Sequence, residues 1–201
     1  RIDKLGFAAH EGAVSPDGKF AYLPVYGDSN AGVPGTDGTE VLKLDTSTFK
    51  VVGRYVFDRG VRPHGIVFNT NDGFLYVTAE LGNEVAVIDP TSMKLVASIP
   101  TGQSLSHMLA ISRSGEYAYV SNIESGSISV LDLKARTLVG VIPVSKKVQR
   151  VAISADERRV YTADHTQLRI AAINTTSRMI DSRTALPAPR LGLPTTSDCH
   201  W

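Results

Sequence analysis

The sequence is poor in the residues that build disulfide frameworks and metal clusters, and it has no long hydrophobic run. Its single cysteine, Cys199, excludes an intrachain disulfide and a multi-cysteine metal site. No stretch of about 18 consecutive apolar residues occurs, so no segment is predicted to cross a bilayer as a helix. Lys plus Arg number 21 and Asp plus Glu number 20, and the formal charge of +1 gives no overall attraction to nucleic acid or to an anionic membrane.

Several signatures of catalysis and targeting are also absent from the sequence. No serine lies in a G-x-S-x-G pattern, and neither a Gly-rich phosphate loop nor an H-E-x-x-H motif is present. No signal peptide is visible, and the chain opens with Arg1 rather than Met, which is consistent with processing or truncation. The hydrophobic fraction of 42% and the charged fraction of 20% are ordinary for a globular protein.

What the sequence does contain is an internal repeat of about 40 residues. Residues 63–102, 106–145 and 148–187 align with one another without gaps inside the conserved columns. The first two copies are 43 residues apart and the next two are 42 apart. Three columns carry the alignment, and they hold His64, His107 and Gln149; Tyr76, Tyr119 and Tyr161; and Asp89, Asp132 and Asn174.

The N-terminal segment belongs to the same series. His10 and Tyr22 are twelve residues apart, as His64 and Tyr76 are, and the third column falls at Asp45. About ten extra residues separate Tyr22 from Asp45, in the stretch from Gly27 to Gly38. This insertion is rich in Gly, Asp, Asn and Pro, so it is predicted to be a loop.

Each repeat is predicted to form four short strands joined by turns. Apolar, β-branched segments alternate with turn chemistry such as "NTNDG" and "DPTSM", and no 3.6-residue periodicity is present. Four strands in about 43 residues are typical of a blade of a β-propeller. We therefore predict an all-β propeller in a single domain over 1–201, with antiparallel four-stranded blades at about 10–57, 64–100, 107–144 and 149–187, and with the start of a truncated fifth blade at 188–201.

Two interpretations of the blade number remain open. Four blades in about 200 residues would make a complete four-bladed ring. The unfinished repeat at 188–201 instead favours a fragment of a longer ring, of seven blades. An incomplete ring would expose blade faces and edges, and this predicts a tendency toward self-association.

The segments "YVTAELGNEVAVIDPTSMKLVASIPTG", "YVSNIESGSISVLDLKARTLVGVIPV" and "AVSPDGKFAYLPV" resemble the YVTN family of β-propeller repeat proteins, with lactonase-like and cytochrome-d1-like propellers as relatives. The resemblance covers about 10–186. It implies a propeller in a bacterial or archaeal protein of the periplasm, the cell surface or the secreted fraction. The Asn of the family's namesake motif is assigned here only to Asn122, with Ala79 and Ala163 at the corresponding positions, so no function is attached to that column.

The histidine column provides the main candidate site. It precedes the innermost strand of each blade, so its residues are predicted to surround one mouth of the central channel as a ligand-binding ring of His10, Glu11, His64, His107, Gln149 and Arg190. Imidazole is a common metal ligand, and His10, His64 and His107 are the candidate metal ligands. The structural alternative is that a repeat copies its own residues and that each His caps a strand. The structural role is favoured for these histidines, and the ligand-binding role stays open.

Two further groups have weaker functional interpretations. Asp28, Asn30 and Asp37 of the insertion could bind Ca²⁺, but a rim loop that shapes one face of the propeller is favoured. A basic group in the fourth repeat could contact an anionic partner, but a solvated edge is favoured because no aromatic stacking platform accompanies it. The group comprises Lys146, Lys147, Arg150, Arg158 and Arg159.

The sequence thus favours a non-enzymatic binding scaffold that presents a channel-mouth surface to a small-molecule or protein ligand, and not to nucleic acid. The alternative is an enzyme, either a lactonase-like hydrolase or a redox-cofactor propeller that uses the histidine column. Neither a particular cofactor nor a catalytic residue is identified by the residues alone, since propellers serve both binding and catalysis.

Overall fold

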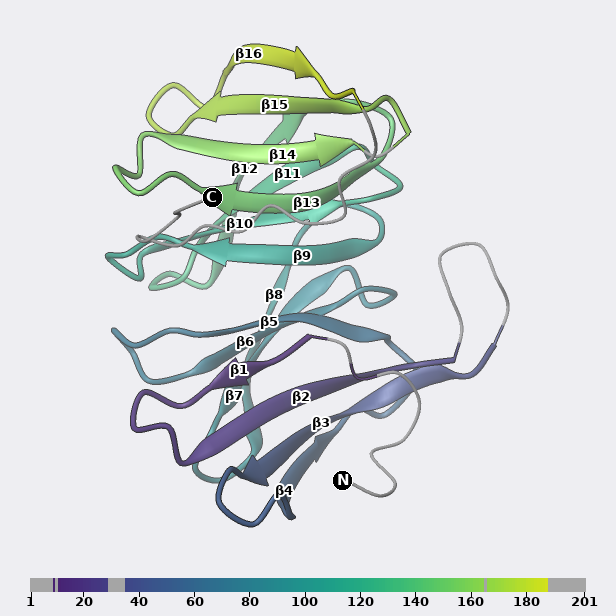
Figure 1. Cartoon of the computed structure of the whole chain (residues 1–201), viewed down its shortest axis with the longest axis vertical. Helices are drawn as coiled ribbons and strands as arrows, with labels where there is room; N and C mark the ends of the chain where they lie inside the picture. The colour runs from purple at the N-terminus through teal and green to yellow at the C-terminus, as the bar shows by residue number, and fades with distance from the viewer. Residues whose placement is uncertain (1–8, 10, 29–34, 165, 188–201) are drawn as a thin grey trace. The chain divides into compact units, whose positions relative to one another are not determined.

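Four sheets of four antiparallel strands make up the chain in the computed structural model, which describes residues 9, 11–28, 35–164 and 166–187 (Figure 1). The described residues contain no helix, so none that is long and apolar enough to span a membrane occurs among them. The all-β prediction with blade-like sheets is confirmed. Residues 188–201, where a fifth blade is predicted to start, lie outside the described residues.

The sixteen strands follow the repeat. Blade 1 holds β1 (Ala13–Val14), β2 (Phe20–Gly27), β3 (Asp37–Asp45) and β4 (Val51–Val56). Blade 2 holds β5 (Pro63–Phe68), β6 (Leu75–Ala79), β7 (Glu84–Asp89) and β8 (Lys94–Pro100). Blade 3 holds β9 (Ser106–Ile111), β10 (Tyr117–Asn122), β11 (Ser127–Asp132) and β12 (Thr137–Pro143). Blade 4 holds β13 (Val148–Ile153), β14 (Arg159–Asp164), β15 (Arg169–Asn174) and β16 (Ile180–Ala185).

The chain divides into two compact units, Arg1–Ile99 and Pro100–Trp201, which we call unit 1 and unit 2. Unit 1 contains blades 1 and 2 except for Pro100, the final residue of β8. Unit 2 contains Pro100 together with blades 3 and 4. Within unit 1 both β1 and β2 contact β5, and within unit 2 both β9 and β10 contact β13. The inner strands of neighbouring blades therefore meet in both units. The prediction of a single domain over 1–201 stays a prediction.

The strand register confirms the tyrosine column. In every blade the tyrosine of the second strand is paired with the residue two places before the Asp or Asn of the third strand. The pairs are Tyr22 with Lys43, Tyr76 with Val87, Tyr119 with Val130, and Tyr161 with Ala172. A one-residue slip would move all apolar side chains to the opposite face, so this shared register keeps the same face buried in each blade.

Buried aliphatic side chains from two blades form the core of each unit. In unit 1, Val41 of blade 1 and Val77 and Ile88 of blade 2 are fully buried in one cluster, together with Tyr22. In unit 2, Tyr119 of blade 3 belongs to a cluster with Val160 of blade 4. The tyrosines of blades 1 and 3 thus pack between blades, as their column predicts.

The acidic column after the third strand has the structural role predicted for it. The Asp45 carboxylate accepts hydrogen bonds from the backbone N–H groups of Ser47 at 3.0 Å and Thr48 at 2.8 Å. The residue four places after each Asp or Asn then adopts a left-handed conformation, with φ between 51° and 56° at Phe49, Met93, Arg136 and Arg178. Side-chain capping of this kind satisfies backbone donors that a tight turn leaves open.

Removing a core side chain should show how far each unit depends on the packing between blades. Ile88→Ala deletes a fully buried side chain, and we expect it to lower the free energy of unfolding of the complete protein by about 2–5 kcal/mol. Leu95→Ala on the outer strand β8 is the control, because this side chain is exposed and its loss should cost less than about 0.5 kcal/mol. Denaturant unfolding followed by far-UV circular dichroism measures the stability of both variants. Equal losses of stability would contradict the assigned core.

The turn carboxylates should make the stability of the fold sensitive to acid. Hydrogen bonds from the Ser47 hydroxyl and from the backbone and side chain of Thr48 lower the pKa of Asp45 from 3.8 to about 2. A carboxylate with a lowered pKa stabilises the folded state fully above its unfolded pKa, and this contribution is lost as the pH falls toward 2. We expect Asp45→Asn, which keeps a hydrogen-bond acceptor but does not titrate, to flatten the decline in stability between about pH 4 and pH 2. An unchanged acid limb would refute this role.

Candidate functional site

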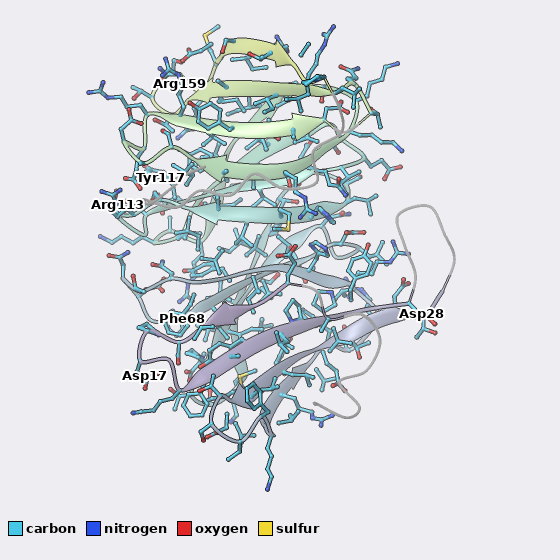
Figure 2. The ribbon with its side chains drawn as sticks, in the orientation of Figure 1. Asp17, Asp28, Phe68, Arg113, Tyr117 and Arg159 are labelled. Atoms are coloured by element: carbon cyan, nitrogen blue, oxygen red, sulfur yellow. The ribbon has the colours of Figure 1, made fainter. Side chains whose placement is uncertain are left out.

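The two ends of each blade carry different chemistry. We call the end where the second strand leads into the third the BC end, and the end where the first strand leads into the second the AB end. In unit 1, Figure 2 shows Asp28 at the BC end and Asp17 and Phe68 at the AB end. The insertion of blade 1 leaves the sheet at the BC end, directly after β2.

Five polar or aromatic residues converge at the BC end of unit 1, and we call them the BC-end cluster. They come from both blades: Tyr26 is the penultimate residue of β2, Asp37 begins β3, Arg62 precedes β5, His64 lies in β5, and Glu80 follows β6. Residues up to 54 places apart in sequence are thereby brought to one edge of two neighbouring sheets. The cluster sits at the foot of the blade-1 insertion.

The guanidinium of Arg62 joins the two carboxylates of the cluster. Its Nε lies 2.6 Å from Asp37 Oδ1, and its Nη1 lies 3.5 Å from Glu80 Oε1. The hydroxyl of Tyr26 donates a hydrogen bond to the same Glu80 oxygen at 3.0 Å. The Tyr26 ring also meets the imidazole of His64 edge to face, with 5.1 Å between ring centroids.

The cluster is largely shielded from solvent. The Glu80 side chain is completely buried, the Arg62 side chain is 12% exposed, and His64 is buried. Burial, and secondarily the negative charge of Glu80, raises the pKa of the Tyr26 phenol, so it remains a hydrogen-bond donor at neutral pH. Burial lowers the pKa of Arg62, but hydrogen bonding to Asp37 and the nearby negative charges outweigh it and raise the pKa overall.

The backbone at the foot of the insertion is held by a close approach of two strands. The N–H groups of Val61 and Arg62 both donate to the carbonyl of Gly38 at 3.1 Å. A Cβ at Gly38 would lie only 1.8 Å from the backbone oxygen of Val25, so only glycine fits here. This contact fixes the peptide that carries Arg62 against blade 1.

Blade 3 lacks this charged pair. In blade 2 the N–H of Glu80 donates to the carbonyl of Arg62 at 3.2 Å, and in blade 3 the N–H of Ile123 donates to the carbonyl of Leu105 at 2.9 Å. The two pairs therefore occupy equivalent positions. Blade 3 fills them with two aliphatic side chains, whereas blade 2 places a buried ion pair there.

The BC end of blade 3 is held by neutral groups instead. Asn122 Oδ1 accepts from the Ser106 hydroxyl at 3.0 Å, and its Nδ2 donates to Ser129 Oγ at 2.9 Å. The Ser129 hydroxyl in turn donates to the carbonyl of Thr101 at 2.9 Å. This network fastens the start of the inner strand to the second and third strands, and its groups satisfy one another.

The strand pairing corrects the column of the namesake Asn. Asn122 pairs with Ser127 at the end of the second strand, and the equivalent pair in blade 4 is Asp164 with Arg169. The placement of Ala163 in this column is therefore wrong, because Ala163 pairs one residue further in. Burial raises the pKa of Asp164, but hydrogen bonds, led by those of Thr166 and Ser145, outweigh it and lower the pKa overall.

The structure places the described members of the histidine column inside the inner strands and not ahead of them. His64, His107 and Gln149 are the second residues of β5, β9 and β13, and both histidines are buried. A register shift interrupts the pairing of the first two strands at this point in blades 2, 3 and 4. Such bulges redirect side chains and are common beside functional sites.

The convergence of this column on one ligand stays a prediction. His64 belongs to unit 1, whereas His107 and Gln149 belong to unit 2. Glu11 is half-buried ahead of β1, and His10 and Arg190 lie outside the described residues. Within the part of the chain that the structure describes, no three His, Cys, Asp or Glu side chains form a group that could hold a metal ion.

The insertion is shorter than its composition predicts. β2 continues through Gly27 and β3 begins at Asp37, so Asp37 is a strand residue whose carboxylate binds Arg62. Asp28 is exposed, and its carboxylate accepts a hydrogen bond from the Thr36 N–H at 2.5 Å. Asn30 lies outside the described residues, and Ca²⁺ binding by this loop stays a prediction.

The fold separates the basic residues of blade 4. Lys146 and Lys147 precede β13 at the BC end, whereas Arg158 and Arg159 lie at the start of β14 at the AB end. Arg159 is also paired with Asp181 at 3.2 Å. The group is therefore not one patch, which supports its interpretation as a solvated edge.

Three members of the BC-end cluster, Tyr26, Arg62 and Glu80, were not predicted from the sequence. The signal was present in the repeat alignment, where Glu80 falls opposite Ile123 and Arg62 opposite Leu105. A charged residue in a column that another blade fills with an aliphatic one marks a departure from the structural pattern. An alignment based on shared residues does not reveal such a departure.

The internal comparison with blade 3 provides a test of the ion pair. Arg62→Leu alone leaves the buried Glu80 carboxylate without its cation, and we expect it to destabilise the complete protein by about 3–5 kcal/mol. Arg62→Leu combined with Glu80→Ile installs the blade-3 pair and should recover most of that loss. Chemical unfolding of the two variants and of Glu80→Ile forms a double-mutant cycle. Additive effects would show that the two side chains do not interact.

Comparison with known proteins places the chain among propellers. The family model described as "Lactonase, 7-bladed beta-propeller" matches residues 5–185. The chain is similar to 6-phosphogluconolactonase of Bacillus subtilis, with 26% identity over 180 residues that cover 84% of this chain and 50% of the relative. It is also 24% identical to the uncharacterised protein YncE of Salmonella typhimurium over 62% of this chain and 35% of that protein.

Solved structures share the fold. Hydrazine synthase of Kuenenia stuttgartiensis matches with a TM-score of 0.73 and 23% identity, over 90% of this chain and 50% of that chain. A protein of unknown function from Desulfotomaculum acetoxidans matches with a TM-score of 0.67 and 17% identity, over 87% of this chain and 54% of that chain. The chain spans half or less of the length of the curated relatives it matches. Its repeat, its blade architecture and the match across residues 5–185 show that the chain belongs to the seven-bladed β-propeller lactonase family.

Proposed function

We propose that the complete protein is a binding propeller that holds a neutral sugar lactone at the BC end of its blades. The observation that carries this proposal is the buried Arg62–Glu80 pair, which stands where blade 3 has Leu105 and Ile123. A buried ion pair contributes less to stability than aliphatic packing of the same volume often does. Its presence at one place in a repeat is therefore better explained by a ligand than by folding.

The charges of the cluster favour a neutral ligand. Asp37 and Glu80 carry two negative charges and Arg62 carries one positive charge, so the cluster would repel an added carboxylate or phosphate. A lactone ring offers carbonyl and hydroxyl groups that can accept from a guanidinium and donate to a carboxylate. The family assignment and the relative named 6-phosphogluconolactonase support a lactone as the ligand class.

Lactone hydrolysis is the second candidate, and the same relative favours it. Hydrolysis requires a group that activates water and a group that protonates the leaving oxygen. His64, Tyr26 and Glu80 are the titratable groups at this end that could supply them. Against hydrolysis, Glu80 already accepts bonds from two donors and is fully buried, which suits a positioning role better than proton transfer.

Assays on the complete protein separate the two functions. Binding predicts that D-glucono-1,5-lactone raises the unfolding temperature in a saturable way without releasing acid faster than buffer does. Hydrolysis predicts acid release from this lactone or from 6-phosphogluconolactone, with a lower kcat in His64→Gln. Glutamine is the residue that the repeat uses at Gln149, so this variant should fold.

The variants identify the site. Arg62→Leu combined with Glu80→Ile should weaken lactone binding at least about tenfold, which corresponds to about 1.4 kcal/mol. His107→Gln, in the same column of unit 2, is the matched control for His64→Gln and should leave lactone binding and hydrolysis unchanged. A loss of either in His107→Gln would show that the whole column takes part. A protein that neither binds nor hydrolyses either lactone would overturn both candidates.

The remaining expectations also belong to the complete protein. We propose a periplasmic, secreted or cell-surface location on the strength of the family resemblance, and fractionation of the source cells would test it. Self-association of this chain follows if its blade faces are left uncovered. Sedimentation velocity of this chain over a range of concentrations would show whether it self-associates.

A further inference from the structure

A cavity of about 380 Å³ opens at the AB end of unit 2, between blades 3 and 4, and we call it the AB cavity. Figure 2 labels Tyr117 and Arg113 at this end of the unit. Its volume lies within the range of small-molecule sites. The lining residues that matter here are Ser112, Tyr117, Tyr119, Glu157, Thr175 and Arg178.

The repeat produces a cleft at this place, and the lining decides what the cleft can bind. Unit 1 has a corresponding cleft of about 330 Å³ at its AB end, lined by Phe20, Tyr22 and Lys43 among others. There the Lys43 ammonium lies 4.1 Å from the centroid of the Phe20 ring and donates to the carbonyl of Pro90 at 2.8 Å. The unit-1 cleft therefore already holds its own cation, whereas Val130 stands at the position of Lys43 in unit 2.

Glu157 departs from the repeat at a conformationally demanding position. The AB turns of blades 1 and 3 place Gly18 and Gly115 there, with φ of 71° and 73°. In blade 4 the same turn carries Glu157 with φ of 58°, and its N–H donates to the carbonyl of Ser154 at 2.9 Å as in the other turns. A non-glycine residue in this region carries a conformational cost, and such residues gather at functional sites.

The Glu157 carboxylate is directed across the boundary between the two blades. Its Oε1 accepts a hydrogen bond from the backbone N–H of Arg113 in blade 3. Its Oε2 accepts no hydrogen bond from the described residues. One carboxylate oxygen is thus fixed in place while the other is available to a ligand in the cavity.

Arg178 supplies the opposite charge from the facing turn. Its Nη1 donates to the carbonyl of Val139 at 2.7 Å, and its side chain packs over Gly140. This bond uses one of the five N–H donors of the guanidinium. In unit 1 the apolar Met93 occupies the same turn position and packs over Gly53 in the same way.

Both charges act on the same phenol. Burial is the main reason that the pKa of Tyr119 is raised, while Arg178 acts to lower it and Glu157 acts to raise it. The two opposite charges line the cavity together with Tyr119. Together with the hydroxyl groups of Ser112 and Thr175, they give the cavity fixed donors and acceptors and no net charge.

We propose that the AB cavity binds a neutral, polyhydroxylated molecule of monosaccharide size. Sugar hydroxyls both donate and accept, so one face of the molecule can meet the carboxylate and another the guanidinium through strong, charge-assisted hydrogen bonds. The rings of Tyr117 and Tyr119 offer flat apolar surface for the C–H groups of a sugar ring. This site belongs to unit 2, whereas the BC-end cluster belongs to unit 1, and it does not depend on the function proposed for that cluster.

Calorimetric titration of the complete protein tests the ligand class. The probes are D-glucose, D-galactose and D-mannose, with glycine as a zwitterion and inorganic phosphate as an anion. We expect saturable binding of at least one sugar with a Kd of about 1 mM or tighter. Absence of sugar binding, or tighter binding of glycine than of any sugar, would overturn the proposal.

Two substitutions that restore residues of the repeat locate the site. Glu157→Gly introduces the residue found at Gly115, and Arg178→Met introduces the residue found at Met93, so both variants should fold. Each should weaken sugar binding about tenfold or more. Arg136→Met alters the same turn position in blade 3, outside the cavity lining, and should leave the affinity unchanged.

The BC-end variant distinguishes the two sites. Arg62→Leu combined with Glu80→Ile should not change sugar affinity at the AB cavity. If the sugar instead binds at the BC end, this variant will abolish binding and Glu157→Gly will not, and the AB-cavity proposal is then wrong. Loss of lactone binding at the BC end leaves the sugar result unaffected, so either proposal can fail without the other.

Discussion

A four-stranded sheet has two broad faces, and a single blade cannot cover either of them by itself. The packing of one blade on the next is therefore the interaction on which the rest of this structure depends. In unit 1 the buried cluster draws Val41 from blade 1 and Val77 and Ile88 from blade 2, and unit 2 builds its cluster from blades 3 and 4 in the same way. Tyr22 and Tyr119 of the second strands contribute to these cores, and the shared register places them at equivalent positions in blades 1 and 3.

This packing leaves the ends of the blades to the turns, and the turns are where the blades differ. Strand interiors hold nearly the same pattern of apolar residues in each repeat, since any change there disturbs two blades at once. At the ends, a residue can change with little effect on the core. The BC end of blade 3 accordingly uses a neutral network around Asn122, while blade 2 places an ion pair between Arg62 and Glu80 at its BC end.

A repeat supplies its own reference state, and this makes departures from it informative. The backbone hydrogen bonds of blade 3 match those of blade 2 at Glu80 and Ile123, so the charged side chain cannot be attributed to a different local fold. The same reasoning applies to Glu157, which adopts a left-handed conformation where two other blades have glycine. In both places the chain has a residue that costs more to accommodate than the one found at the same position in another blade.

The sequence by itself determined the all-β class and the columns of tyrosine and acidic residues. These follow from alternating apolar residues and from turn chemistry, which act over a few residues and repeat at a fixed period. The tertiary structure decided which polar side chains meet. It placed Asp37 in a strand against Arg62, separated Lys146 from Arg159, and assigned Asp164 rather than Ala163 to the column of Asn122. Contacts of this kind depend on strand register and on the packing of one blade against another, which no short stretch of sequence specifies.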